Sequence, residues 1–194
     1  MENALELLKQ TSFAINELSQ DEWASFSAIW KPFNCKRKEQ LTEVGSIEKY
    51  LYFVYEGVQR VYYIDDDGRE ATIVFTYAPS FGGVIDSFML QQPAKYFYET
   101  LTPSKFLIAT ESEVNKVALQ NAGIETLLKK GITMALSGVL ERIMELQCFT
   151  SEQKFKQLLS RSPHILQLVP HKYLANYIGI DATNFSKLIN QVRI

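Results

Sequence analysis

The middle of the chain, from about Phe33 to Ala109, is a succession of short runs rich in β-branched and aromatic residues, separated by turn signals. Runs such as YLYFVYEG, VQRVYYI and ATIVFTYA have the composition of strands. In the segment IDDDGRE, consecutive Asp residues precede Gly68, which predicts a tight hairpin turn. Because several such strands follow one another at short spacing, the sequence predicts a sandwich or barrel rather than a sheet with helical crossovers.

Both flanks of this segment have a helical period. Residues 2–30 are predicted to be helical, with a capping box from Ser19 to Glu22. After the strands, apolar residues spaced by 4, 3, 4 and 3 form the seam of a helix that pairs with another helix: Ile132, Leu136, Val139, Ile143 and Leu146. Gly131 and Gly138 beside this seam would let two backbones approach closely. The seam predicts a homodimer, and packing of the helix on its own barrel is the alternative.

The last segment, VPHKYLANYIGIDATNFSKLINQVRI, has the pattern of two helices joined by a glycine turn. A capping box at Thr150–Gln153 opens the helix before it. Gly179 is predicted to end the first helix of the pair, and Asp181 to cap the second. The second helix has an apolar side and a polar side, which predicts a helix-turn-helix that reads the major groove of DNA. An ordinary antiparallel helix pair is the alternative.

The residues expected to contact DNA divide by their chemistry. Thr183, Asn184 and Lys187, near the start of the second helix, are the candidates for base edges, and Asn190 lies on the same polar side. The predicted phosphate contacts are Lys172 and Arg193.

Charge is distributed unevenly along the chain. The whole sequence has a net charge of −2, yet residues 149–194 hold six Lys and Arg against two Asp and Glu, a net charge of +4. A basic C-terminal block behind an acidic body fits a nucleic-acid partner.

The chain resembles a known family, the Crp/Fnr regulators of bacteria. The segment VPHKYLANYIGIDATNFSKLI is similar to the family pattern P-x-K-Y-[IL]-A-x-Y-[IL]-G-I-x-x-x-x-[LF]-S-[RK]-[IL]. The matching residues are Lys172, Tyr173, Ala175, Tyr177, Gly179, Ile180, Ser186 and Lys187. A looser similarity covers the hairpin YFVYEGVQRVYYIDDDGRE.

The resemblance implies an α+β chain in three parts. Residues 1–116 would form a cyclic-nucleotide-binding-like β-roll, that is, a jelly roll or double-stranded β-helix, with flanking helices. Residues 117–148 would form a long dimerisation helix, and residues 149–194 an all-α helix-turn-helix domain. The implied function is a cytoplasmic, homodimeric transcription regulator that binds double-stranded DNA, with RNA polymerase as a further partner to consider. Family members usually continue into a β-wing after the recognition helix, so a short or missing wing is expected here.

Cyclic-nucleotide binders of this family have a glycine turn whose N–H groups face the phosphate, followed by a Glu for the ribose and, about ten residues later, an Arg. Here the turn is SFGGVID, with Gly83 in place of the Glu and Ala94 or Lys95 in place of the Arg. A buried phosphate needs such partners, because an unpaired buried charge is costly. The residues expected around an effector are Gly82, Gly83, Val84, Lys95 and Tyr96. We therefore expect no cofactor and an unidentified small-molecule effector rather than cAMP or cGMP.

Other function classes lack their residues. The two histidines, His164 and His171, both lie in the C-terminal block, so a histidine metal site in the barrel is not expected. Two cysteines cannot hold an iron–sulfur cluster. The sequence contains no hydrolase or nucleotide-binding motif and no membrane-spanning apolar run, so neither an enzyme nor a membrane protein is expected. The alternatives that stay open are a cAMP-responsive regulator and a β-roll interaction module that does not bind DNA.

Overall fold

The computed structural model describes residues 2–191. The helices and strands are α1 (Glu2–Ile15), α2 (Gln20–Ser27), β1 (Lys31–Cys35), β2 (Gln40–Thr42), β3 (Tyr50–Glu56), β4 (Val58–Ile64), β5 (Glu70–Tyr77), β6 (Ser80–Gly82), α3 (Ile85–Leu90), β7 (Phe97–Thr100), β8 (Ser104–Thr110), α4 (Glu111–Gln120), α5 (Ala122–Cys148), α6 (Ser151–Arg161), α7 (Ile165–Leu168), α8 (His171–Tyr177) and α9 (Ala182–Gln191). The protein is therefore a mixture of helices and sheet, as the sequence predicts.

The strands form two four-stranded sheets, in the orders β1-β8-β3-β6 and β2-β7-β4-β5. Every strand pair is antiparallel. The predicted hairpin turn after β4 is confirmed, because the Gly68 amide donates to the Asp65 carbonyl at 2.9 Å and the Asp65 amide to the Arg69 carbonyl at 3.0 Å. Large aromatic residues fill the space between the sheets, among them the buried Tyr52, Tyr98 and Phe106.

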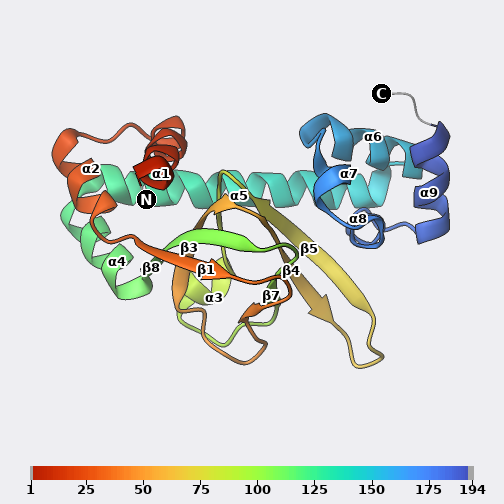
Figure 1. The fold of residues 1–194 in the computed structure, drawn as a ribbon, viewed down its shortest axis with the longest axis horizontal. Helices are drawn as coiled ribbons and strands as arrows, with labels where there is room; N and C mark the ends of the chain where they lie inside the picture. Colours follow the sequence, from red (N-terminus) through yellow and green to blue (C-terminus); the bar gives the residue numbers. More distant parts are fainter. Residues whose placement is uncertain (1, 192–194) are drawn as a thin grey trace.

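Helix α5 extends along the whole molecule (Figure 1). The strands lie against its middle, helices α1, α2 and α4 gather at one end, and α6 to α9 gather at the other. The first end has its own core, in which Phe26 and Trp30 pack with Ile124 and Leu127 of α5. The predicted boundary between residues 116 and 117 falls inside α4, and the long helix begins at Ala122.

The C-terminal helices share a core with the strands. Phe155, Leu174 and Phe185 belong to the same buried cluster as Val58 of β4 and Leu101 of the β7–β8 loop. The sequence pattern treats these regions as separate, because a contact between distant segments leaves no local periodicity. The packing therefore fixes the C-terminal helices against the barrel.

Capping boxes in the sequence locate the starts of α2 and α6 correctly. Both predicted capping boxes are confirmed, the first at Ser19 and the second at Thr150. A third, at Thr110 before α4, was not predicted. The short helix α3 was also not predicted, because six residues give too little helical period to read. Within residues 2–191, none of the helices combines the length and apolar character needed to cross a membrane.

Candidate nucleic-acid interface and ligand position

The turn between α8 and α9 has the hydrogen bonds of a Schellman motif. The Gly179 amide donates to the Asn176 carbonyl at 3.1 Å, and the Ile180 amide donates to the Ala175 carbonyl at 3.0 Å. Gly179 has φ +66°, which glycine adopts without steric cost. Asp181 then accepts a hydrogen bond from the Asn184 amide at 2.8 Å, which caps α9. The predicted helix, glycine turn and second helix are thus present in this order.

Helix α9 has one buried face and one exposed face. Phe185 and Leu188 are buried in the C-terminal core. The exposed side chains are Thr183, Ser186, Lys187, Asn190 and Gln191. The Ser186 hydroxyl donates to the Ala182 carbonyl at 2.9 Å, and the Asn190 amide to the Ser186 carbonyl at 3.0 Å. The outer face therefore offers hydroxyl, amide and ammonium groups, the kinds of side chain that read base edges and phosphates.

The remaining predicted DNA contacts differ in position. Lys172 is exposed at the start of α8, with its Nζ 4.6 Å from the centre of the Tyr173 ring. Asn184 is half-buried, and its amide donates to the Ser151 hydroxyl at 3.2 Å, so this side chain is engaged within the chain. Arg193 lies outside the described residues. Ser186 was not among the predicted contacts, although its spacing from Thr183 and Asn190 on one helix could have identified it.

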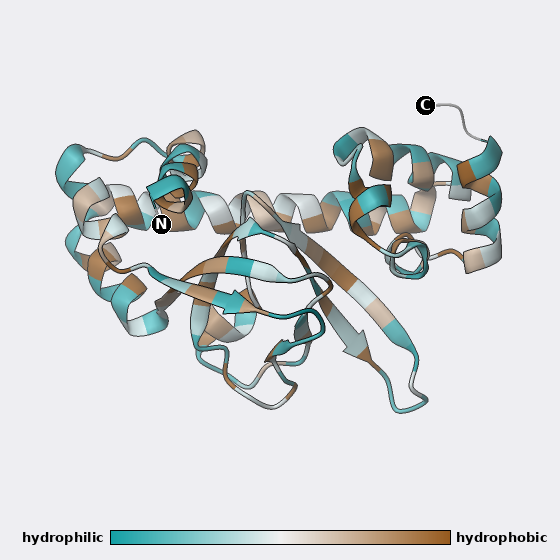
Figure 2. Ribbon diagram, viewed as in Figure 1, coloured by the Kyte–Doolittle hydropathy of each residue, from teal (hydrophilic) through white to brown (hydrophobic). Residues whose placement is uncertain are grey.

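The five seam residues lie on α5 and are between 37% and 54% exposed. Further apolar side chains beside them are also exposed: Met134, Leu140 and Met144. Figure 2 shows hydrophobic residues recurring along this helix between its two packed ends. At Gly131 and Gly138 an added Cβ would meet no atom within 4 Å. One face of α5 therefore presents partly exposed apolar side chains along its middle, and at its C-terminal end Leu146 also lines a contact with α6 and α8.

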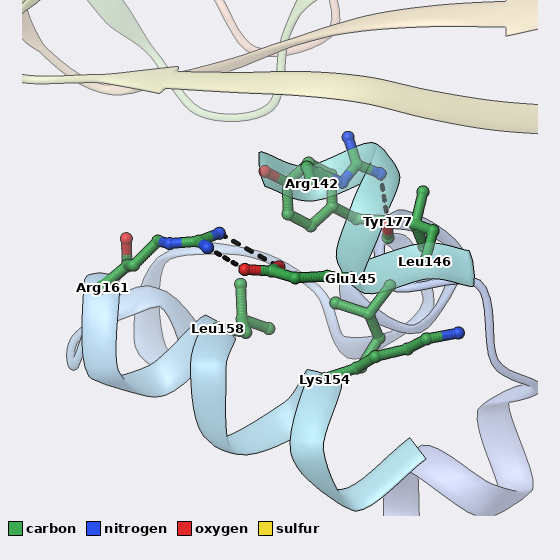
Figure 3. Close-up of a pocket in the computed structure, with 9 residues that line it drawn as sticks. Arg142, Glu145, Leu146, Lys154, Leu158, Arg161 and Tyr177 are labelled. Carbon is green, nitrogen blue, oxygen red and sulfur yellow. Dashed lines mark hydrogen bonds and ion pairs between the residues drawn. The ribbon is translucent and has the colours of Figure 1, made fainter. Parts of the chain in front are cut away.

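A small cavity lies where α5, α6 and α8 meet (Figure 3). Its volume is about 50 Å³, room for a few water molecules only. Glu145, 8% exposed, accepts hydrogen bonds from both terminal nitrogens of Arg161. On the other side of the cavity, the Arg142 guanidinium stacks on the Tyr177 ring at 3.4 Å from its centre. These side chains join the three helices and leave no room for a ligand the size of a nucleotide.

The predicted effector position lies at the β6–α3 turn. Gly82, Gly83 and Val84 are all buried there. Gly83 has φ +120°, and an added Cβ would lie 3.3 Å from Cδ2 of Tyr52. At Gly82 an added Cβ would lie 2.6 Å from the Tyr98 hydroxyl. The turn is therefore in contact with side chains of the barrel itself.

A buried carboxylate, Glu48, lies against this turn and is only 2% exposed. Its Oε2 accepts hydrogen bonds from the Thr42 hydroxyl and, at 3.3 Å, from the Val84 amide. Its Oε1 accepts from the Tyr50 amide at 3.3 Å. Burial raises the pKa of Glu48, and these hydrogen bonds oppose the rise. Glu48 was not among the predicted site residues, because it lies 35 residues before the glycine turn that it contacts and no local motif links the two.

Tyr98 fills the interior beside Glu48. It is fully buried, and its hydroxyl lies 3.0 Å from that of Thr76. The buried Gln59 amide group continues the network, 2.9 Å from the Thr76 hydroxyl and 2.8 Å from the Ser104 hydroxyl. Burial raises the pKa of the Tyr98 phenol beyond its ordinary range, so the phenol stays neutral. The space between the sheets is thus occupied by a hydrogen-bonded set of the protein's own side chains.

The other two predicted pocket residues lie apart from this network. Lys95 is exposed, whereas the preceding Ala94 is 2% exposed and pairs through its backbone with Gly45 and Ser46 at 2.8 Å each. Tyr96 is half-buried and packs on the barrel core. Of the two candidates for the position of the expected Arg, Ala94 is therefore buried and Lys95 exposed.

Comparisons with known proteins bear on the fold. Neither the models of protein families nor the curated protein sequences gave a match. Solved structures do match. FixK2 from Bradyrhizobium japonicum is 15% identical, with 84% of each chain covered and a TM-score of 0.77. The c-di-GMP responsive global regulator CLP from Xanthomonas campestris is 14% identical, over 89% of this chain and 91% of that one, with a TM-score of 0.65.

A third structure, from Eubacterium rectale, is described as a regulator of the crp/fnr family. It is 14% identical over 89% of this chain and 82% of that one, with a TM-score of 0.68. These similarities extend over strands, long helix and C-terminal helices together. The chain therefore has the fold of the Crp/Fnr transcription regulators.

Proposed function

We propose that the protein is a homodimeric, DNA-binding transcription regulator of the Crp/Fnr type rather than an enzyme. The observation that carries the proposal is the outer face of α9, where Thr183, Ser186, Lys187 and Asn190 are exposed on a capped helix that follows a glycine turn. We interpret α8 and α9 as a helix-turn-helix with α9 as the reading helix. RNA polymerase is a further partner of such a regulator.

We propose that a second copy of the chain covers the apolar surface of α5. Contiguous exposed apolar side chains are costly to leave in water, and a matching helix buries them on both copies at once. Two reading helices held by this pair would meet half-sites about 34 Å apart, one turn of DNA.

We interpret the strand orders β1-β8-β3-β6 and β2-β7-β4-β5 as a jelly roll whose nucleotide position is filled from within. Glu48 holds the turn amide that a phosphate would need, and Tyr98 occupies the space beside it. A phosphate placed there would meet a carboxylate and no Arg. We therefore propose that the protein takes no cyclic-nucleotide cofactor, and that any effector acts at another surface.

The DNA-binding role is tested by titrating the protein against labelled genomic fragments at about 50 and 200 mM salt. A regulator should prefer a few fragments and bind them more weakly at the higher salt, since phosphate contacts release counterions. Absence of binding at both salt concentrations would overturn the proposal and favour a protein-interaction module.

The filled barrel is tested by calorimetry with cAMP and cGMP. We expect no saturable heat from either nucleotide, because Tyr98 and Glu48 would have to leave their hydrogen-bonded positions. Saturable binding of either one at micromolar concentration would favour the alternative of a cAMP-type regulator.

A further inference from the structure

Strand β5 lies at the edge of its sheet and is irregular at one point. Val61 of β4 pairs with Val74, whereas the next residue, Tyr62, pairs with Thr72. Ile73 is thus an extra residue without a partner in β4, a β-bulge that frees backbone groups of an edge strand. Such groups are partners for side chains of another element.

Asn176 of α8 bonds to this edge with both ends of its amide. Its Oδ1 accepts a hydrogen bond from the Thr72 amide at 2.6 Å, and its Nδ2 donates to the Glu70 carbonyl at 2.6 Å. Its neighbour Tyr177 packs on Phe75 of β5, with ring centres 5.0 Å apart. Through Asn176, helix α8 is therefore hydrogen-bonded to backbone groups of edge strand β5 that a further strand could otherwise use.

Arg142 of α5 bonds to the same bulge. Its guanidinium donates to the carbonyls of Thr72, at 3.1 Å, and Ile73 on the strand, and to the carbonyl of Tyr177 on α8. Figure 3 shows Arg142 and Tyr177 stacked, with strands passing beside them. The Arg142 side chain thus joins α5, strand β5 and helix α8. The planar guanidinium, with its several N–H donors in a fixed fork, suits this contact with three carbonyls.

We propose that Asn176 and Arg142 are positioning residues for DNA recognition: by joining α8 and α5 to the bulged edge of β5, they set where α9 stands relative to the dimer helix. The inference rests on the proposed function. Beyond that function, Asn176 and Arg142 would determine the separation of the two α9 helices in the dimer. That separation sets the half-site spacing that the dimer accepts.

The first test measures position without DNA. Spin labels are attached at Asp66→Cys, on the exposed hairpin, and Ser160→Cys, exposed on α6, in a Cys148→Ser background diluted with unlabelled protein. The distance distribution should be narrow in the parent and about twofold wider in Asn176→Ala, because the backbone groups of β5 lose their partner. Arg142→Lys should also widen it, since the ammonium has a single nitrogen in place of the two terminal nitrogens that contact the three carbonyls. The matched control is Asn115→Ala, an exposed asparagine on α4.

The second test measures spacing preference with operators whose half-sites are moved by up to two base pairs either way. The parent should lose about tenfold in affinity at the extremes, and Asn176→Ala only about threefold, because loosely held reading units tolerate more spacings. A folded Asn176→Ala protein with an unchanged distance width and an unchanged spacing preference overturns the inference. If the parent itself binds no DNA, the proposed function fails and the spacing role with it, whereas the distance test still decides whether these residues hold α8.

Discussion

The β6–α3 turn and the α8–α9 turn are built from similar parts and present opposite faces. Each has a turn with a positive-φ glycine followed by a helix, and this glycine is buried at the first turn (Gly83) and exposed at the second (Gly179). At the first turn, Glu48 and Tyr98 occupy the space in front of the glycines. After the second turn, the side chains of α9 extend outward. A glycine turn before a helix can therefore bind a ligand only where the rest of the fold leaves the space in front of it open.

Presentation of two α9 helices depends on the proposed dimer, and substitutions at the apolar surface of α5 should therefore have the greatest effect. Val139→Asp together with Ile143→Asp should convert the proposed dimer to monomers in analytical sedimentation, since unpaired charges would be buried at the interface. The matched control is Leu119→Asp on α4, which introduces the same charge at a residue 81% exposed and outside the seam. A dimer that survives the double substitution would show that another face of α5 forms the contact.

At the β6–α3 turn, an added methyl group tests whether the space in front of the glycines is occupied. Gly82→Ala should lower the free energy of unfolding by about 1–3 kcal/mol, because the new methyl group would lie against the Tyr98 hydroxyl. Removing that hydroxyl in the double variant Gly82→Ala/Tyr98→Phe should make the cost of the alanine smaller than it is in the parent. Urea denaturation of the parent, the two single variants and the double variant measures the free energy of unfolding in each. Equal costs in both backgrounds would mean that Tyr98 does not occupy the space in front of Gly82.

Lys187 tests whether the outward face reads DNA. Lys187→Ala should weaken operator binding about tenfold, about 1.4 kcal/mol, and leave dimerisation unchanged. A base contact would relax the sequence preference at one position, and a phosphate contact would instead lower the salt slope by about 1. Fluorescence anisotropy distinguishes these outcomes, with Lys116→Ala on α4 as the exposed-lysine control. Unchanged affinity and preference would remove Lys187 from the interface.

The smallest expected effect is the pH dependence due to Glu48. Burial raises its pKa in the folded protein above the ordinary value of 4.5. The folded state then holds the proton more tightly than the unfolded chain, so the stabilisation is complete below about pH 4.5 and is lost as pH rises through the folded pKa. Relative to Glu48→Gln, the parent should lose at most about 1.4 kcal/mol of stability per pH unit in this window.

Urea denaturation at several pH values from 4 to 8 measures that difference. Glu43→Gln, at an exposed glutamate of the same loop, is the matched control and should follow the parent. A constant difference between parent and Glu48→Gln would mean that Glu48 is no more costly to ionise in the fold than in the unfolded chain.

Local features of this protein could be predicted from its sequence. The capping boxes at Ser19 and Thr150, the hairpin turn at Gly68 and the end of α8 at Gly179 all depend on residues within a few positions of one another. The two faces of α9 could be predicted for the same reason, because helical spacing alone sorts side chains into faces. The absent Glu and Arg at the barrel turn were also visible in the sequence, and they argued against a cyclic nucleotide.

The sequence thus predicts the central strands, the helices that flank them and the two faces of α9, although not the short helix α3. The side chains that fill the space between the sheets and the contacts that hold α8 against β5 become visible only in the folded structure. Glu48 accepts a hydrogen bond from the Val84 amide, 36 residues away in the chain, and Asn176 accepts one from the Thr72 amide, 104 residues away. The first contact depends on how the strands pack around the β6–α3 turn, and the second on the edge position of β5 beside α8. No spacing along the chain encodes them, because they depend on how separate elements pack together.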